Sequence, residues 1–182
     1  MKRLTLLVLF SMLMAPFSSV TLAGGVKVGT LFDNSGALKD WGPRQQNAAE
    51  LAAQQMAAAG FTIEFFLEDS QTAAEPAKIA ARKLIETDKV AVIIGSSSSG
   101  VIVPVAESVT CPENVLMMSP GATSPFITDL PEDKDKDFLF RTCPSDALQG
   151  AVLGRLAAGL YKTASVMYVN NAYGQGLADQ FR

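Results

Sequence analysis

The chain has 182 residues, of which 48% are hydrophobic and 18% are charged, and its formal net charge is −3. This composition is typical of a globular protein, and the absence of a basic stretch beyond the extreme N-terminus argues against nucleic-acid binding. The sequence contains no histidine, which excludes a Ser-His-Asp triad, a Cys-His dyad and a histidine-ligated metal ion. We therefore expect no catalytic residues, no metal site and no cofactor.

Residues 1–23 have the pattern of a secretory signal peptide. Lys2 and Arg3 precede an apolar run, LTLLVLFSMLMAPF, and the small residues of TLA end the segment before a cleavage site. The apolar run is shorter than the roughly 20 residues that span a bilayer, so a membrane anchor is the less favoured alternative. We expect export of the chain, with a mature protein that begins near residue 24.

Apolar runs alternate with helical patterns along the rest of the chain. Strands are expected at residues 26–32, 61–69, 90–95, 114–119, 137–142 and 164–171, and helices at 43–60, 74–88, 100–109, 145–161 and from 173 onward. The first helix should turn inward Ala48, Leu51, Ala52 and Met56, and the second Ala77, Ala80, Ala81, Leu84 and Ile85. This alternation predicts an α/β fold with a parallel sheet sandwiched by helices.

The pattern also predicts two unequal parts. Residues 24–142 contain enough strands and helices for a complete lobe, which ends after a polar surface loop at 123–137. Residues 143–182 supply only a helix, a strand and the start of another helix, so we expect a second lobe that is truncated. The apolar side chains of its first helix should then lie exposed: Leu148, Val152, Leu153, Leu156 and Leu160.

A run of four serines, Ser96–Ser99, stands between two apolar segments, at the carboxyl end of the third strand and the amino end of a helix. Ligands of open α/β sheets bind at that edge, where free N–H groups and hydroxyls attract a carboxylate. The next strand ends in SPGATSP, which adds Gly121 and Thr123. The alternative, that these residues are only turns and helix caps, is equally open from local sequence. The run is neither a phosphate loop nor a nucleophile elbow, since the Gly-Lys-Ser/Thr ending and the G-x-S-x-G spacing are missing.

Four motifs in order, GSSSSGVIVPVAE, LMMSPGATSPFIT, FRTCPSDALQG and YVNNAYGQGLA, resemble the leucine-binding family of type I periplasmic binding proteins. The resemblance runs from about Val26 to the last residue. It implies a Rossmann-like lobe and a second lobe that close on a small ligand, without chemistry. The implied function is the capture of a branched-chain amino acid, or a related carboxylate or amide, for the membrane permease of an ABC transporter in the periplasm.

The resemblance also implies which residues meet the ligand. Ser99, with Ser98 beside it, would bind the carboxylate, and the loop of Gly121, Ala122 and Thr123 would bind the ammonium and carboxylate groups. Trp41 would pack on the ligand, although a lone tryptophan is more often a core residue. Tyr173 would reach in from the second lobe, or else simply begin a surface helix. These ligand-binding residues are expected together: Trp41, Ser98, Ser99, Gly121, Ala122, Thr123 and Tyr173.

Three acidic or amide side chains follow the first two strands and are expected to have structural roles. Asp33 and Asn34 have the pattern of turn residues, and Asp69 that of a helix cap or hinge contact. The cysteines, Cys111 and Cys143, are expected to form a disulfide in an exported protein, with two free buried thiols as the alternative.

Other functions remain as alternatives to the solute-binding protein. One is the sensor domain of a receptor, and the less favoured one is an α/β enzyme that uses serine or aspartate, or a flavin-binding domain of the flavodoxin type. The fold alone does not separate these functions. The signal peptide, the missing histidines and the missing phosphate loop favour a binding protein.

Overall fold

The computed structural model describes residues 25–182, so the expected signal peptide at 1–23 lies outside the described part. The strands are β1 (Val26–Phe32), β2 (Ile63–Asp69), β3 (Val92–Gly95), β4 (Leu116–Ser119) and β5 (Leu139–Arg141). The helices are α2 (Gly42–Ala58), α3 (Ala74–Glu86), α4 (Ser99–Val105), the π-helical turn η2 (Ala106–Thr110), α5 (Asp146–Leu160) and α6 (Ala172–Phe181). Short 3₁₀ turns are η1 (Gly36–Leu38), η3 (Pro125–Ile127) and η4 (Pro131–Asp133).

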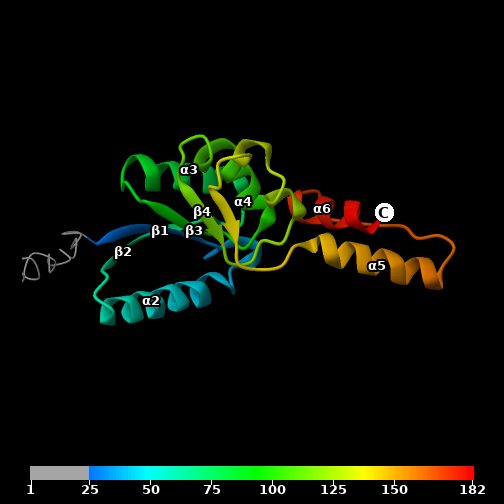
Figure 1. The fold of residues 1–182 in the computed structure, drawn as a ribbon, viewed down its shortest axis with the longest axis horizontal. Helices are drawn as coiled ribbons and strands as arrows, with labels where there is room; N and C mark the ends of the chain where they lie inside the picture. The colour runs from blue at the N-terminus through cyan, green and yellow to red at the C-terminus, as the bar shows by residue number, and fades with distance from the viewer. Residues whose placement is uncertain (1–24) are drawn as a thin grey trace, which may run out of the picture.

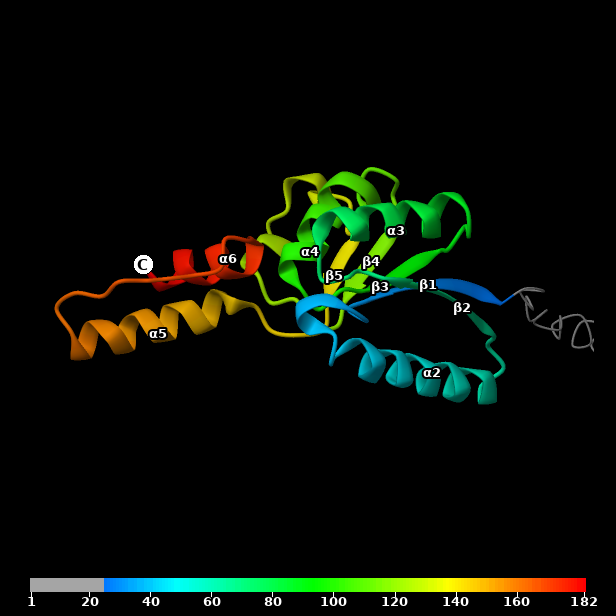
Figure 2. The same cartoon turned by 180° about the vertical axis from the view of Figure 1, so that it is seen from behind.

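The five strands form one sheet in the order β2-β1-β3-β4-β5, and every neighbouring pair is parallel. Helices lie on both faces, with α3 and α4 over one face and α2 on the other (Figures 1 and 2). The predicted α/β fold with a helix-covered parallel sheet is therefore confirmed. Because all strands run the same way, their carboxyl ends meet at one edge, where the chain enters its loops.

The hydrophobic core lies between the sheet and the helices that cover one of its faces, α3, α4 and η2. Leu31, Ile93 and Met117 from the strands are fully buried there against Leu84 of α3 and Ile102 of α4. Four of the five inward positions predicted for α3 are buried, and the fifth, Ile85, is partly buried at the margin of the core. Pro104 stands inside the helical segment without ending it, and the segment runs on into η2.

Helix α2 presents a different face to the sheet from the one its alanines and leucine predict. Leu51 and Met56 are 55% and 41% exposed, and Ala48 and Ala52 are exposed as well, so the predicted inward face is wrong. The half-buried positions are Gln45, Gln46, Ala49 and Ala53. The reason is polar pairing: Thr30 of β1 donates to Gln46 Oε1 at 3.3 Å, and Gln45 donates to Ser97.

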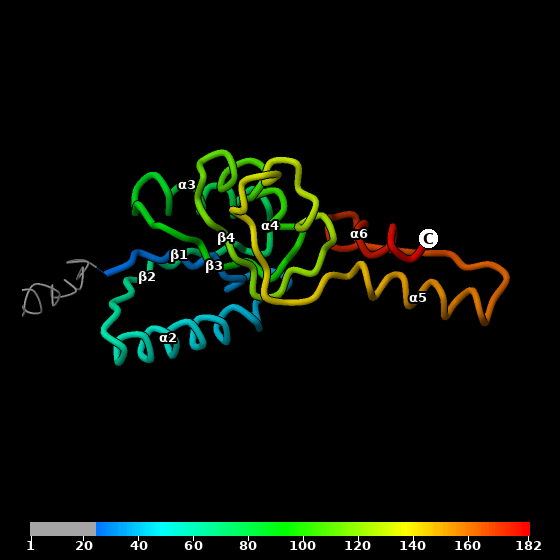
Figure 3. The backbone as a smooth tube through the Cα atoms, viewed as in Figure 1, coloured from blue at the N-terminus to red at the C-terminus, as the bar shows by residue number. Residues whose placement is uncertain are grey.

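Helices α5 and α6 pack against each other and extend away from the sheet (Figures 1 and 3). Their contact is close at Gly150, where an added Cβ would lie 2.4 Å from Gln180 Cβ. At its amino end α6 joins the sheet lobe, since Ser124 Oγ donates to the Ala172 carbonyl at 2.8 Å. The apolar side chains predicted to be exposed on α5 are all at least 41% exposed.

The strand predicted at 164–171 is not formed, and these residues run as an extended connection between α5 and α6. An isolated segment forms a strand only where a neighbour satisfies its backbone N–H and C=O groups, and the described residues offer this segment no such neighbour. Met167 in its middle is 98% exposed. Among the described residues, the structure contains no helix that is long and apolar enough to cross a membrane.

Candidate functional site

The strand order places a topological switch point between β1 and β3. The chain moves from β1 outward to β2 and then returns to add β3, β4 and β5 on the other side of β1. In open parallel sheets, ligands bind outside the carboxyl ends of the strands at this kind of switch point. Here that edge is formed by the loops that follow β1, β3 and β4, and it is lined with hydroxyl groups.

A buried carboxylate, Asp33, ties the strand ends together at the switch point. Its side chain is fully buried and accepts hydrogen bonds from Ser70 Oγ at 2.6 Å, Ser96 Oγ at 2.5 Å and the Ser97 N–H at 2.9 Å. The three donors follow β2 and β3, while Asp33 follows β1. The prediction that Asp33 is a simple turn residue is therefore wrong, because the carboxylate joins three adjacent strands.

Each serine of the run Ser96–Ser99 has a different role. Ser96 is buried, and its hydroxyl donates to Asp33 and accepts the Ser98 N–H at 3.0 Å. Ser98 is the N-cap residue of α4, and its carbonyl accepts the first helical N–H groups. Ser99 is 2% exposed, and its hydroxyl accepts the Ser124 N–H at 3.1 Å. Ser97 lines a cavity.

That cavity, which we call the strand-end pocket, has a volume of about 260 Å³. Its lining residues come from the loop after β1, from α2 and from the loops after β3 and β4: Leu38, Trp41, Gln45, Ser97, Pro120 and Gly121. Trp41 is 54% exposed, so it is not a core residue and forms an open wall of the pocket. None of the lining residues is charged, and apolar walls with a few polar groups are typical of small-molecule sites.

The absence of a side chain at Gly121 keeps the pocket open. A Cβ added at this position would lie 2.7 Å from Ser97 Oγ, which is closer than real contacts of this kind. The loop is held by Ser119, whose hydroxyl donates to the Ser96 carbonyl at 2.6 Å and accepts the Ala122 N–H at 2.9 Å. The loops after β3 and β4 are thereby fixed to each other beneath the pocket.

Two polar residues of the pocket, Gln45 and Ser97, were not among the residues expected from the sequence. Gln45 Nε2 donates to Ser97 Oγ, and Gln45 Oε1 is a buried side-chain oxygen without a hydrogen-bond partner among the described residues. Helical spacing gives the signal that could have found Gln45, since it follows Trp41 by four residues and so shares its side of the helix.

Asp69 holds the loop that leads to Trp41. Its Oδ1 accepts the N–H groups of Asn34 and Ser35 at 3.0 and 3.2 Å, and its Oδ2 accepts the Ser35 hydroxyl at 2.6 Å. Burial alone would raise the pKa of Asp69, but the hydrogen bonds from Ser35, Gln71 and Asn34 outweigh it and hold the pKa below its ordinary value. The carboxylate thus fixes the start of the loop that leads to Trp41.

The other expected ligand residues lie outside the strand-end pocket. Ala122 is buried at 1% exposure, and Thr123 donates its hydroxyl to Asp146 Oδ2 at 2.6 Å, at the start of α5. Tyr173 lies on α6 and lines a separate cavity of about 430 Å³ with residues of α5 and of the 165–169 connection. Of the seven expected residues, Trp41 and Gly121 are the ones that line one pocket together.

The expected disulfide between Cys111 and Cys143 is not formed, and both residues are free cysteines. Cys111 precedes β4 and Cys143 follows β5, so they stand at opposite edges of the sheet. A four-residue strand such as β4 is about 10 Å long, which already exceeds the Cα separation of about 7 Å that a disulfide tolerates. Burial, together with the charge and hydrogen bonding of Asp133, raises the pKa of the Cys111 thiol to about 11.

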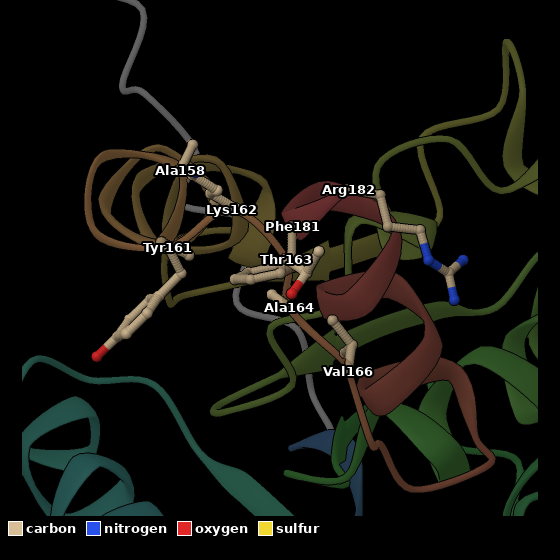
Figure 4. Close-up of a pocket in the computed structure, with 10 residues that line it drawn as sticks. Ala158, Tyr161, Lys162, Thr163, Ala164, Val166, Phe181 and Arg182 are labelled. Carbon is tan, nitrogen blue, oxygen red and sulfur yellow. The ribbon is translucent and has the colours of Figure 1, made fainter.

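A larger cavity of about 560 Å³ lies between α5, the following connection and the end of α6. Figure 4 shows that Tyr161 and Arg182 point away from each other there, on either side of Thr163. Alanines and a glycine supply part of its wall, and Lys162 and Arg182 are its charged residues. In residues 25–182, no group of three or more His, Cys, Asp or Glu side chains is placed to hold a metal ion.

Comparison with protein families gives a match to the family described as periplasmic binding protein over residues 25–182. A Leu/Ile/Val-binding protein of Rhizobium johnstonii, BraC3, is 28% identical over 187 aligned positions, which cover 100% of this chain and 48% of the relative. A leucine-, isoleucine-, valine-, threonine- and alanine-binding protein of Pseudomonas aeruginosa is 29% identical, with coverage of 94% and 46%.

Among solved structures, a solute-binding protein of an ABC transporter from R. palustris, in complex with benzoate, superposes with a TM-score of 0.72. It is 27% identical, and the match covers 87% of this chain and 44% of the R. palustris protein. The chain thus spans about half the length of the relatives that it matches.

Proposed function

Because the chain belongs to the periplasmic binding protein family, we propose that it is a lobe of a solute-binding protein that holds a small organic molecule at the carboxyl edge of its sheet. The observation that carries this proposal is the strand-end pocket. It lies at the switch point of the sheet, Trp41 forms an apolar wall, and the hydroxyl of Ser97 and the open backbone of Gly121 face the same small volume. These features suit a ligand with one polar end and one apolar part.

The proposed ligand is a branched-chain amino acid or a related carboxylate or amide. The relatives from R. johnstonii and P. aeruginosa are named for amino acids such as leucine, isoleucine and valine. The R. palustris relative is in complex with an aromatic acid. Both kinds of molecule have an apolar part that matches Trp41 and Leu38.

We propose Trp41, Ser97 and Gly121 as contacts from this lobe. The backbone N–H groups at the start of α4, next to Ser98 and Ser99, remain candidates for a carboxylate, because helix N-termini favour anions. Thr123 and Ala122 would contribute through the loop that they share with Gly121. Tyr173 would reach the ligand only after a movement, since it lines another cavity in this structure.

The proposed mechanism is closure of two lobes on the ligand, without a chemical step. In this scheme the lobe at 24–142 supplies the sheet edge, and residues 143–182 begin the second lobe. The protein would work in the periplasm, after removal of residues 1–23, and would deliver its ligand to the membrane permease of an ABC transporter. The family and the names of the relatives support this role.

Isothermal titration calorimetry on the full chain tests the proposal with a panel of aliphatic amino acids, their amides and aromatic acids. We expect saturable binding of at least one class, and binding about tenfold weaker in Ser97→Ala, since a hydrogen bond to a charged group contributes about 1.5–3 kcal/mol. Ser108→Ala is the matched control, because Ser108 bonds to the Pro104 carbonyl within its own helical segment. No binding by any compound of the panel would refute the proposal.

A further inference from the structure

We infer that Thr72 is a positioning residue of the strand-end pocket, because its hydroxyl holds the loop that carries the apolar wall of the pocket. This wall consists of Leu38 and Trp41. Thr72 is not itself a lining residue, since it follows β2 in the loop that leads to α3. The inference rests on the proposed function, because it concerns how the apolar part of a ligand is received at the same pocket.

The Thr72 hydroxyl makes two hydrogen bonds to the loop between β1 and α2. It donates to the Ser35 carbonyl at 2.9 Å and accepts the Leu38 N–H at 3.1 Å. The Leu38 carbonyl in turn accepts the Trp41 N–H at 2.9 Å, and the Trp41 carbonyl accepts the Gln45 N–H at 3.0 Å. One side chain from another loop is therefore bonded to both ends of the turn η1, which leads directly to Trp41.

The loop that contains Thr72 is itself well anchored. The Thr72 N–H donates to Ser70 Oγ at 3.1 Å, and Ser70 Oγ donates to the buried Asp33 carboxylate at 2.6 Å. Gln71 and Thr72 have left-handed backbone conformations, with φ of 53° and 51°, which persist only where the surroundings hold the chain in place. The two loops also touch closely, since a Cβ added at Gly36 would lie 2.1 Å from the Gln71 carbonyl oxygen. Thr72 therefore presents its hydroxyl from a fixed base.

Asp69 and Thr72 hold different parts of the loop between β1 and α2. The bonds from Asp69 reach the start of this loop, as far as Ser35. In the part of the chain that the structure describes, the side-chain partner of the Leu38 N–H is Thr72. Loss of the hydroxyl should therefore leave the start of the loop in place and release Leu38 and Trp41. A pocket whose wall is in place for only a fraction of the time has an apparent affinity reduced by that fraction.

The test is Thr72→Val, which keeps the shape of the side chain and removes both hydrogen bonds. The first measurement is acrylamide quenching of Trp41, the single tryptophan of the chain, and it needs no ligand. Trp41 is 54% exposed, so release of the loop should raise its quenching constant, by up to about twofold. Thr72→Ser, which keeps the hydroxyl, should match the wild type. Thr87→Val, at the exposed end of α3, is the control and should match it too.

Calorimetry with leucine and with benzoate on the same four proteins connects the loop to binding. A probe that binds the wild type should bind Thr72→Val about fivefold or more weakly, with Thr72→Ser and Thr87→Val unchanged. An unchanged quenching constant or affinity in Thr72→Val, or an equal loss in Thr72→Ser, would overturn the inference while solute binding itself stands. If no compound of the panel binds the wild type, the proposed function fails and the ligand role of Thr72 fails with it, whereas quenching still shows whether Thr72 holds the wall.

Discussion

Replacement of Asp33 by asparagine is the sharpest test of how the strand ends are held together. The substitution keeps the shape of the side chain but exchanges one carboxylate oxygen for an NH₂ group. Asp33 Oδ1 accepts two serine hydroxyls and Oδ2 accepts the Ser97 N–H. An asparagine whose Oδ1 still accepts the two serine hydroxyls must point its NH₂ group toward the Ser97 N–H. Two hydrogen-bond donors then face each other without an acceptor.

The magnitude follows from these bonds. A buried donor left without an acceptor costs about 1–3 kcal/mol, and each serine bond loses about 1 kcal/mol when its acceptor is no longer charged. Removal of a buried charge offsets part of this loss, since desolvation of an ion is expensive. We expect Asp33→Asn to lower the free energy of unfolding by about 2–4 kcal/mol.

Urea denaturation at pH 7, followed by circular dichroism, measures this loss. The denaturation midpoint should fall by about 1–2 M, given a slope of about 2 kcal/mol per molar of urea for a chain of this size. Asp40→Asn is the matched control, because Asp40 is an exposed carboxylate in the same loop, and it should leave the midpoint unchanged. Equal midpoints for the two variants would show that Asp33 does not hold the strand ends.

Three further predictions concern the cysteines, Asp69 and the floor of the pocket. Iodoacetamide at pH 8 should modify Cys143 in the native protein and spare Cys111, whose thiol is buried and has a raised pKa; a single added label in intact mass spectrometry checks this, and two labels or none would contradict it. Asp69 has a pKa below its ordinary value, so its contribution to stability is full above about pH 4 and is lost as the pH falls through the lower folded-state pKa. In acid titrations the difference in the free energy of unfolding between wild type and Asp69→Asn should therefore shrink below about pH 4, and a difference that grows there would be inconsistent with this sign. Gly121→Ala should weaken solute binding at least about tenfold, because its Cβ displaces Ser97 Oγ, whereas Gly159→Ala, which meets no atom within 4 Å, should have no effect on calorimetric affinity.

The sheet was predictable because its strands are apolar runs buried on the core side. The runs that became β1, β3 and β4 have no competing helical pattern, and their parallel arrangement follows from the intervening helices. The run at 164–171 has the same character, but strand formation depends on a hydrogen-bonding neighbour, which is not a property of the run itself.

The site was predictable only in part, because sequence patterns locate strand ends but not the direction of each side chain. Trp41, expected from the family resemblance, and Gly121, expected from the end of its strand, both line the strand-end pocket. Ser97 was missed because four adjacent serines look alike in the sequence and differ only in their hydrogen-bond partners. The partner of the Ser97 N–H, Asp33, lies 64 residues earlier in the chain. Gln45 was missed because the helix face was chosen from apolar positions alone, while its actual contact is polar.

The most direct test of the central claim, a solute site in the strand-end pocket, is a fluorescence titration. Trp41 is the single tryptophan of the chain and forms a half-exposed wall of this pocket, so its emission reports on the pocket alone. We expect a compound that binds in calorimetry to produce a saturable change in Trp41 emission with the same dissociation constant. A compound that binds tightly in calorimetry without any change in Trp41 emission, and with unchanged affinity in Trp41→Ala, would show that the solute site lies elsewhere.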